Sequence, residues 1–173
     1  MNVISSISQV YVWGTNQNKI EKFSKQMSEE LKVNIEATVN LADVASKSDI
    51  IFTCTSAKKY FLHKEYVRPG TFISAVGADS PDKQELDPQL LTNGKLVVDI
   101  LEQCAHVGEL HHAMNANLMS TDDVYGEFGD IVSGKIGGRS SSEEIIIFDT
   151  TGSAIQDTAA AVSVYEKAIS IVK

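Results

Sequence analysis

The chain alternates between apolar runs that end in glycine or hydroxyl residues and segments that show helical periodicity. The runs at residues 49–55 (DIIFTCT) and 71–77 (TFISAVG) are almost continuously apolar, which is typical of strands buried on both faces of a sheet. Residues 20–31 instead carry apolar side chains three and four positions apart, which indicates an amphipathic helix. Strands that alternate with helices predict an α/β fold with a doubly wound, mostly parallel sheet.

The same patterns place the remaining elements. Further strands are predicted at residues 9–13, 33–37, 96–99 and 145–148. Helices are predicted over residues 15–31, 40–45, 102–117 with a break at Gly108, 121–134 with Val124, Phe128, Ile131 and Val132 as apolar positions, and from Gly152 to the C-terminus. No repeat, low-complexity segment or linker interrupts the pattern, so we assign one domain to residues 1–173 and a surface loop to the Gly/Ser-rich residues 133–142.

Composition argues against several classes of function. The formal net charge is −8 and Lys and Arg do not cluster, so the chain gains no attraction to a phosphate backbone. No apolar run approaches the roughly 18 residues of a membrane span, and residues 1–6 do not resemble a signal peptide. Cys54 and Cys104 lie outside any C-x-x-C motif and are expected to be buried free thiols. We therefore expect a cytoplasmic protein that binds neither nucleic acid nor membrane.

Polar residues gather where the predicted strands end. In an open parallel sheet, ligands bind in the crevice beyond the carboxyl ends of the strands. Polar or glycine-bearing stretches follow four strands, at residues 14–16 (GTN), 53–56 (TCTS), 75–83 (AVGADSPDK) and 149–152 (DTTG). A turn that any strand end needs explains each stretch alone equally well. All four together predict a ligand-binding edge.

Asp79 and Lys83 form the sharpest candidate within these stretches. A carboxylate just past a buried strand could hold an iminium or activate a water, and a lysine four residues later could reach a phosphate or ribose oxygen. A turn in which Asp79 bonds its own backbone explains the same spacing equally well. Glu109 fits a first-turn carboxylate that the helix dipole favours. We predict no metal site, because metal-ligand spacing is absent around the four histidines, His63, His106, His111 and His112.

Five motifs resemble one known family, in order along the chain from about Val10 to about Glu166. They are VYVWG (10–14), AVGADSP (75–81) with KQELD (83–87), GEL (108–110), FDTTG (148–152) and the pair Gln156-Asp157. They are similar to the corresponding segments of ornithine cyclodeaminase, mu-crystallin and related imine reductases. The resemblance implies a Rossmann-like domain that binds NAD(P).

The resemblance also implies roles for single residues. Asp79 matches the catalytic aspartate beside the substrate's α-carbon, and Thr151 matches a position next to the substrate. Family members transfer hydride between nicotinamide and the α-carbon of an amino or imino acid, either converting ornithine to proline with loss of ammonia or reducing ketimines. They also form homo-oligomers. Contacts with the dinucleotide are implied at Thr53, Ser74, Ala75, Lys83 and Thr150.

The sequence departs from the family at the glycine-rich turn. No G-x-G-x-x-G occurs in the 173 residues, although this turn normally seats the pyrophosphate against a helix N-terminus. The family's substrate and dimerisation domain has no counterpart either, which indicates a chain cut short at its N-terminus. Gly14 stands where many NAD-binding members carry an acidic residue for the ribose 2′-hydroxyl. Because Thr15 and Asn16 would tolerate a 2′-phosphate, we expect a weak preference for NADP.

The absence of a first strand has a structural consequence. In the strand order 3-2-1-4-5-6, the first strand lies between the strand at Val10 and the strand at Asp49. Its loss leaves two unpaired strand edges, and residues 1–8 are too few to supply a strand and its crossover. We expect the two halves to close on each other or another chain to fill the gap.

Three hypotheses about function follow. The chain is a family enzyme whose isolated form is inactive, a non-catalytic remnant that folds and dimerises, or one half of a split enzyme completed by a second polypeptide. The sequence alone leaves all three open.

Overall fold

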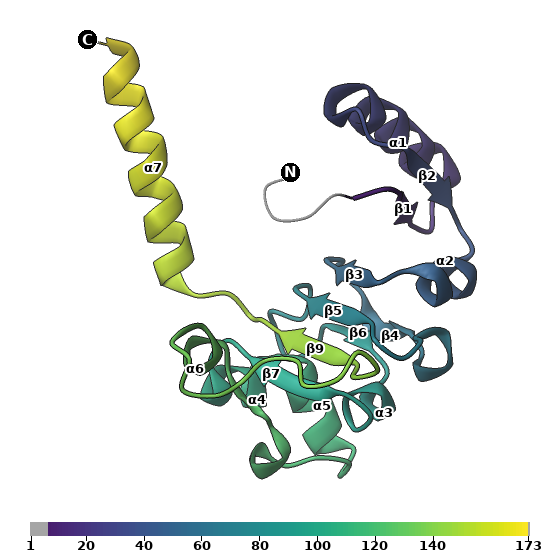
Figure 1. The fold of residues 1–173 in the computed structure, drawn as a ribbon, viewed down its shortest axis with the longest axis vertical. Helices are drawn as coiled ribbons and strands as arrows, with labels where there is room; N and C mark the ends of the chain where they lie inside the picture. The colour runs from purple at the N-terminus through teal and green to yellow at the C-terminus, as the bar shows by residue number, and fades with distance from the viewer. Residues whose placement is uncertain (1–6, 173) are drawn as a thin grey trace. The chain divides into compact units, whose positions relative to one another are not determined.

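The computed structural model of the chain describes residues 7–172, without the side chain of Val172. Its strands, labelled in Figure 1, are β1 (Val10–Trp13), β2 (Ile35–Thr38), β3 (Ile50–Thr53), β4 (Lys58–Leu62), β5 (Phe72–Ala75), β6 (Gln84–Leu86), β7 (Lys95–Val98), β8 (Gly126–Glu127) and β9 (Ile146–Asp149). Its helices are α1 (Gln17–Leu31), α2 (Leu41–Lys47), α3 (Pro88–Leu91), α4 (Leu101–Val107), α5 (Glu109–Asn115), α6 (Phe128–Val132) and α7 (Ala154–Val172), with short 3-10 turns η1 (Lys64–Tyr66) and η2 (Thr121–Asp123).

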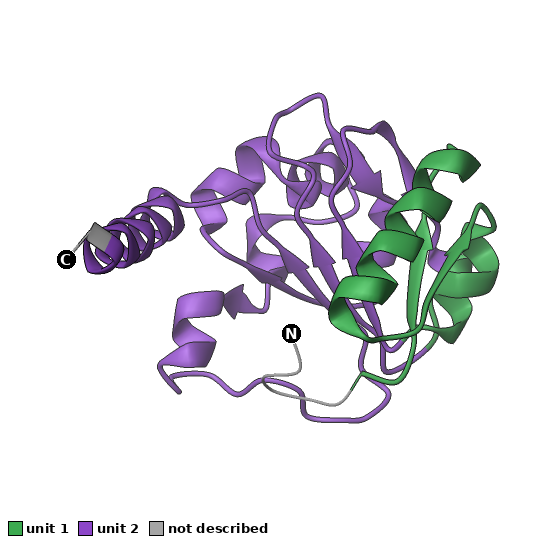
Figure 2. Cartoon of the chain, turned by 90° about the horizontal axis from the view of Figure 1, so that it is seen from above, with its two compact units in different colours: residues 1–48, 65–68 green, residues 49–64, 69–173 purple. Residues whose placement is uncertain are grey.

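These elements form two compact units, coloured separately in Figure 2. Unit 1 comprises the described residues up to Ser48 together with Glu65–Arg68, and unit 2 comprises Asp49–Lys64 and the chain from Pro69 onward. The assignment of one domain to residues 1–173 stays a prediction.

Unit 1 is a parallel β-α-β unit. β1 pairs with β2 in register from Val10 opposite Ile35 to Trp13 opposite Thr38, and α1 connects the two strands. Asn16 caps α1 as predicted, because its side-chain oxygen accepts a hydrogen bond from the backbone N–H of Lys19 at 3.1 Å.

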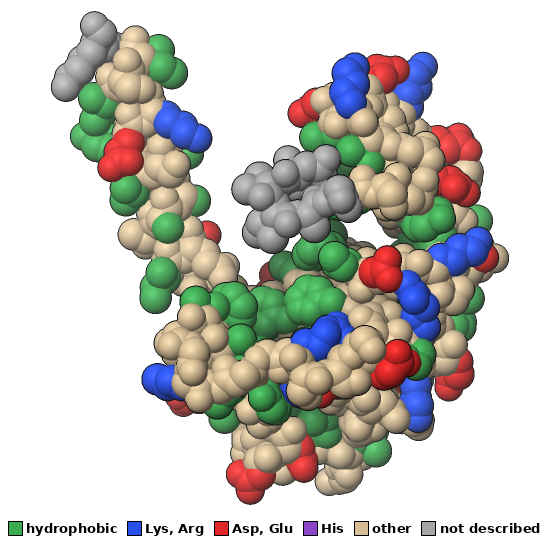
Figure 3. Space-filling view, in the orientation of Figure 1, with side chains coloured by type: hydrophobic (Ala, Val, Ile, Leu, Met, Phe, Trp, Pro, Cys, Tyr) green, Lys and Arg blue, Asp and Glu red, His purple; other side chains and the backbone are tan. Residues whose placement is uncertain are grey.

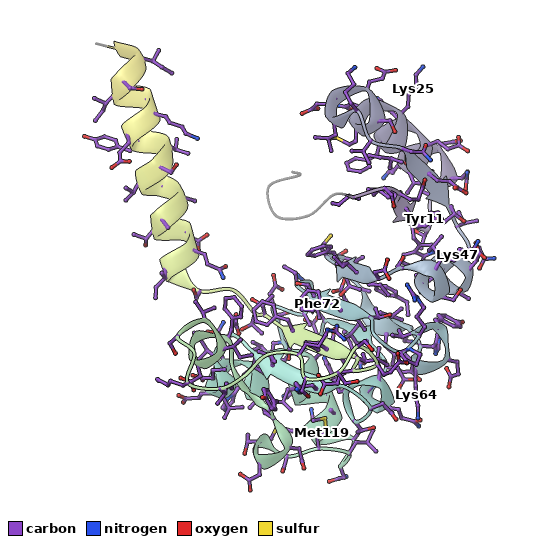
Figure 4. All side chains as sticks on the ribbon, in the orientation of Figure 1. Tyr11, Lys25, Lys47, Lys64, Phe72 and Met119 are labelled. Carbon is purple, nitrogen blue, oxygen red and sulfur yellow. The ribbon has the colours of Figure 1, made fainter. Side chains whose placement is uncertain are left out.

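Unit 2 contains a five-stranded parallel sheet in the order β3-β5-β9-β7-β8. The last strand in sequence, β9, therefore lies between β5, which begins at Phe72 (labelled in Figure 4), and β7. Parallel neighbours require crossover connections. The strand β4 and the 3-10 turn η1 lie in the connection from β3 to β5, and α4 and α5 lie in the connection from β7 to β8. The predicted α/β fold with a mostly parallel sheet is confirmed.

Aliphatic side chains from the strands and from α3 and α5 form the core of unit 2. Burial of each such side chain contributes about 1.5–3 kcal/mol. Figure 1 shows α3, α4 and α5 grouped beside the sheet, and α5 contacts both α3 and α4. The largest fully buried aliphatic residues are Leu62, Ile73, Leu86, Leu90, Leu91, Leu96, Leu110 and Ile147.

Two predictions of local structure were wrong. Val124 was expected in a helix, but the chain turns at η2 and continues as β8, which pairs with β7. The backbone N–H of Tyr125 donates to the carbonyl oxygen of Leu96, so pairing with a neighbouring strand overrides the local periodicity. β4 and β6, which form a separate two-stranded parallel sheet, were expected to be loops.

A third expectation was wrong for one of the two cysteines. Cys104 is buried, but Cys54 is exposed in the turn after β3. Burial raises the pKa of the Cys104 thiol, helped by the carboxylates of Asp149 and Asp99. Cys104 is therefore an unreactive packing residue, as expected.

The strands β1 and β3 each have a single neighbour. Within the described residues, β1 pairs only with β2 and β3 pairs only with β5, and β1 and β3 belong to separate sheets. Ile50 and Phe52 of β3 are exposed. The predicted unpaired edges are thus present in each unit. Residues 1–8 were expected to be too few for a strand and its crossover, and of these, residues 1–6 lie outside the described part of the chain.

The long Ala-rich helix predicted at the C-terminus is α7. Apolar side chains run along it in Figure 3, and Ile155, Val164 and Tyr165 are exposed. Among the described helices, α7 included, none combines the length and the apolar character needed to cross a membrane.

Candidate functional site

The carboxyl ends of the central strands of unit 2 form one row of residues. Thr53 at the end of β3 is in register with Ala75 of β5, which is in register with Asp149 of β9. Val98 of β7 continues the row beside Asp149. Three of the four predicted polar stretches therefore meet at one edge of the sheet, and the fourth, residues 14–16, belongs to unit 1.

The row contains a buried hydroxyl group without a hydrogen-bond partner. Thr53 is 4% exposed, and its Oγ1 atom has no partner among the described residues. Ser74 and Ala75 beside it are buried as well. A buried polar atom that lacks a partner costs free energy, so Thr53 is suited to donate to or accept from a bound ligand.

Asp79 and Lys83 contact each other in the loop after β5. Lys83 Nζ lies 2.6 Å from Asp79 Oδ1, and the side chains are 28% and 53% exposed. The carboxylate of Asp79 thus binds the lysine, which is a different contact from the backbone turn considered above. An exposed ion pair contributes only about 0–1 kcal/mol, so both groups can turn to a ligand at little cost.

Asp99 organises the turn that contains Thr150 and Thr151. Its Oδ2 atom accepts hydrogen bonds from Thr150 Oγ1 at 2.8 Å, from the backbone N–H of Thr151 at 2.9 Å and from that of Gly152 at 3.0 Å. Thr150 is buried, and its backbone N–H donates to the carbonyl oxygen of Ala75 at 3.0 Å. Sequence reasoning missed Asp99, although an acidic residue directly after the run 96–98 carries the same signal as Asp149 after β9.

Three carboxyl groups are buried in this region, and one of them is Asp149 of the row. The Glu85 side chain accepts from the backbone N–H of Thr55 at 2.5 Å and from that of Gly77 at 3.0 Å. Glu109 Oε1 accepts from the backbone N–H of Glu85 at 2.7 Å, and Asp149 Oδ2 accepts from that of Leu110 at 2.9 Å. We name Glu85, Glu109 and Asp149 the buried carboxyl group.

Two acids of the buried carboxyl group, Glu109 and Asp149, have raised pKa values. Burial raises the pKa of Glu109 to about 8 and that of Asp149 to about 7. Glu109 is 1% exposed and reaches across to β6, so the reading of a simple first-turn carboxylate was incomplete. Gly108, directly before Glu109, is the sequence signal that could have revealed this contact with β6.

Two glycines make room for the buried carboxyl group. A Cβ atom at Gly77 would lie 2.5 Å from Glu85 Oε1, and one at Gly108 would lie 2.5 Å from Asp149 Oδ2. No side chain fits at Gly77 unless the Glu85 carboxyl moves, and none fits at Gly108 unless the Asp149 carboxyl moves. The glycines of the AVGADSP and GEL motifs are therefore explained by these close contacts.

The stretch at residues 14–16 lies between β1 and α1. A Cβ atom at Gly14 would lie 2.8 Å from Ile20 Cγ2, so packing against α1 favours glycine there. Thr15 is exposed, and the side-chain oxygen of Asn16 accepts from the backbone N–H of Lys19. Gly14 has no side chain, so Thr15 is the residue of this stretch that offers a side chain to solvent without a capping role.

Three histidines serve helix packing, as predicted. His106 and His111 contact the carbonyl oxygens of Glu102 and Ala105, and a ring nitrogen of His112 lies 2.7 Å from the carbonyl oxygen of Lys83. Burial lowers the pKa of His112. His112 therefore ties α5 to the loop that carries Asp79 and Lys83.

Known proteins share this arrangement. The model of the ornithine cyclodeaminase/mu-crystallin family matches residues 1–171. The alanine dehydrogenase of Archaeoglobus fulgidus is 40% identical over 167 residues, which are 96% of this chain and 51% of that protein. An archaeal alanine dehydrogenase dimer with bound NAD has a TM-score of 0.88 at 37% identity and covers 96% of this chain and 51% of that chain.

A third relative is a reductase. The Thermococcus litoralis Δ1-pyrroline-2-carboxylate reductase in complex with NADH and L-proline has a TM-score of 0.92 at 30% identity and covers 96% of this chain and 52% of that chain. This chain thus spans about half the length of the relatives it matches. Since the family model covers nearly every residue and these relatives share the fold, the chain belongs to the ornithine cyclodeaminase/mu-crystallin family.

Proposed function

We propose that the chain is the dinucleotide-binding part of an oxidoreductase that transfers hydride between NAD(P) and the α-carbon of an amino or imino acid. The observation that carries this proposal is the row formed by Thr53, Ala75 and Asp149, which brings three of the four polar stretches to one sheet edge. Relatives named alanine dehydrogenase and Δ1-pyrroline-2-carboxylate reductase, with NAD or NADH in their structures, support the substrate class and the cofactor. From the composition of the chain, we also propose that the reaction takes place in the cytoplasm.

The residues of the row fit a dinucleotide. Thr53 Oγ1 is buried without a partner and is suited to a cofactor oxygen, and Lys83 can leave its exposed ion pair for a phosphate or ribose. The nicotinamide, when bound, supplies or accepts the hydride. We assign the remaining cofactor contacts to Ser74, Ala75 and Thr150, and to the turn at Gly14, Thr15 and Asn16.

Asp79 is the proposed catalytic residue. Its carboxylate is half exposed and held only by Lys83, so it can stabilise a protonated imine and hold or release the proton of the substrate nitrogen. Thr151, whose backbone is fixed by Asp99, is proposed to contact the substrate. Substrates of this reaction are small amino or cyclic imino acids.

We further propose that these 173 residues alone do not turn over and that NADP is the preferred cofactor. The sequence holds no G-x-G-x-x-G to seat the pyrophosphate, and no carboxylate at Gly14 to bond a ribose 2′-hydroxyl. A second candidate function is that of one half of a split enzyme. The single-sided pairing of β1 and β3 in the described chain favours it, because such edges accept a further strand.

Titration of the chain with NADPH and with NADH, followed by the fluorescence of Trp13, tests the cofactor site. Saturable binding that weakens in Thr53→Val, with NADPH bound more tightly than NADH, is the expected result. Thr71→Val, which changes a buried threonine directly before β5, is the control. No binding of either nucleotide at millimolar concentration would leave the chain a folded remnant.

Co-expression tests the split enzyme. The polypeptide encoded directly upstream, if it carries a glycine-rich turn, should co-purify with the chain and give NADPH-dependent reduction of Δ1-pyrroline-2-carboxylate. A frameshift or stop in that position contradicts the split enzyme and favours the non-catalytic remnant.

A further inference from the structure

The buried carboxyl group has more acceptor atoms than donors. Glu85, Glu109 and Asp149 are each at most 1% exposed. Backbone N–H groups supply their donors, from Thr55 and Gly77 to Glu85, from Glu85 to Glu109 and from Leu110 to Asp149. Two buried oxygens, Glu109 Oε2 and Asp149 Oδ1, have no partner among the described residues.

A proton on one carboxyl group resolves this excess. Two ionised carboxylates close together in a buried site repel each other, and each unpartnered oxygen costs desolvation energy. Protonation of Glu109 converts an acceptor into a donor and removes one of the charges. Burial raises the pKa of both Glu109 and Asp149, and Glu109 is the acid whose carboxyl oxygen binds the backbone of Glu85, so we assign the proton to Glu109.

Glu109 is connected to the proposed cofactor turns through Glu85. The carboxyl oxygen of Glu109 holds the backbone of Glu85 in β6, and the Glu85 side chain in turn binds the amides of Thr55 and Gly77. Those amides lie in the turns directly after β3 and β5, two residues from Thr53 and from Asp79 respectively. Any displacement of β6 therefore reaches both turns.

We infer that Glu109 stays protonated in the working protein and acts, through Glu85, as a positioning residue for the dinucleotide-binding turns. This inference rests on the proposed function and adds a pH dependence to the same site. Loss of the proton adds a negative charge beside the carboxyl groups of Glu85 and Asp149, pushes β6 from α5 and loosens the turns at Thr55 and Gly77.

Among the described residues around Glu109, no buried cation would neutralise the charge of its ionised carboxylate. α3, which packs on α5, has no titratable side chain, and β6 and β9 contribute only the acids already named. Asp99 adds a further negative charge beside Asp149. The titratable side chains of α4 and of α5 itself are Glu102, Cys104, His106, His111 and His112.

Carbon-13 NMR of the side-chain carboxyl groups in the full chain tests the proton directly. We expect one glutamate carboxyl that titrates near pH 8 and whose signal is lost in Glu109→Gln. Glu102→Gln, a substitution of an exposed first-turn glutamate on α4, should leave that signal in place. A Glu109 carboxyl that titrates near 4.5 overturns the inference.

The pH dependence of NADPH affinity tests the positioning role. If only the protonated form is competent, raising the pH from 7 to 9 weakens binding by about tenfold, because about a tenth of the protein then keeps the proton. Glu109→Gln should bind at both pH values as the wild type does at pH 7, since the amide keeps both the acceptor and a donor. Glu109→Leu should bind weakly at both. A Glu109→Gln variant with the wild-type pH profile overturns the inference.

Hydrogen exchange separates this inference from the proposed function. In Glu109→Leu the amides of Thr55 and Gly77 should exchange faster than in the wild type, and in Glu109→Gln they should not. If the wild type binds no dinucleotide, the proposed function fails, while the carboxyl titration and these two amides still decide the role of Glu109. Unchanged exchange at both amides in Glu109→Leu overturns the connection through Glu85.

Discussion

Glu85 of the buried carboxyl group and the exposed pair Asp79–Lys83 lie only a few residues apart in sequence, yet their chemistry is opposite. Glu85 is fully buried and bound by two backbone amides, whereas Asp79 is half exposed and bound by one flexible lysine. A buried acid that satisfies amides cannot move without leaving them unpaired. An exposed acid in a weak ion pair can turn to a substrate at little cost. The comparison separates the residues that hold the loop from those that are free to react.

The largest expected effect is that of Asp79→Asn on turnover. In the enzyme reconstituted with the proposed second polypeptide, loss of a positioned proton-transfer group should lower kcat by about 10²–10⁴-fold. The free energy of unfolding of the chain should change by less than about 0.5 kcal/mol, because the group is exposed. Urea unfolding and steady-state kinetics measure the two quantities. A destabilisation above that limit with normal kcat would show that Asp79 is structural and would reverse the comparison.

Glu85→Ala should have the largest effect on stability. The substitution leaves the amides of Thr55 and Gly77 without their acceptor, and each buried unsatisfied group costs about 1–3 kcal/mol. We expect the free energy of unfolding to fall by roughly 3 kcal/mol, measured by urea denaturation at pH 7. Asp82→Ala, in the exposed loop, is the control and should change it by less than about 0.5 kcal/mol. Equal effects of the two substitutions would contradict the division between holding and reacting residues.

The pH dependence of stability sharpens the comparison further. The pKa of Glu109 is about 8 in the folded chain against 4.5 for the ordinary group, so the folded state binds more protons between these values. The free energy of unfolding therefore falls as pH rises from 5 to 8, by up to about 1.4 kcal/mol per unit. Asp149, with a pKa raised to about 7, acts in the same direction.

Denaturation of the wild type and of Glu109→Gln across pH 5–8 measures this fall. The slope should be smaller in Glu109→Gln and unchanged in Glu102→Gln. Asp82 and Glu144, whose pKa values are lowered to about 2 by hydrogen bonds, lose their contribution only at more acidic pH and do not disturb the window. Equal slopes in the wild type and in Glu109→Gln would show that Glu109 is ionised in the folded chain.

Sequence patterns predicted most of the sheet, because strands buried on both faces are continuously apolar. β3, β5, β7 and β9 all begin and end within two residues of the predicted runs. β8 was missed because its two residues form a strand only by pairing with β7, and no local sequence pattern predicts that contact. β4 and β6 were missed for the same reason, since their charged residues resemble a loop until they pair.

The candidate site was predicted less completely than the fold. The rule that ligands bind at carboxyl ends of parallel strands located Thr53, Ala75 and Thr150, because it depends on topology alone. It could not reveal that Asp99 binds the turn 150–152, or that Glu85 and Glu109 are connected through a backbone amide. Such contacts join residues 24 to 53 positions apart and depend on packing that a single sequence does not display.

The smallest expected effect is that of Lys83→Met, which tests the exposed side of the comparison. The ion pair with Asp79 is exposed, so its loss should change the free energy of unfolding by less than about 0.5 kcal/mol. NADPH affinity should nevertheless fall by roughly tenfold, because a charge-assisted hydrogen bond to a phosphate or ribose oxygen is worth about 1.5 kcal/mol or more. Lys58→Met, which removes the exposed ion pair with Asp82, is the matched control and should alter neither quantity. If both variants bind NADPH as the wild type does, Lys83 binds Asp79 but does not contact the cofactor. Asp79 is then the only functional residue of the pair.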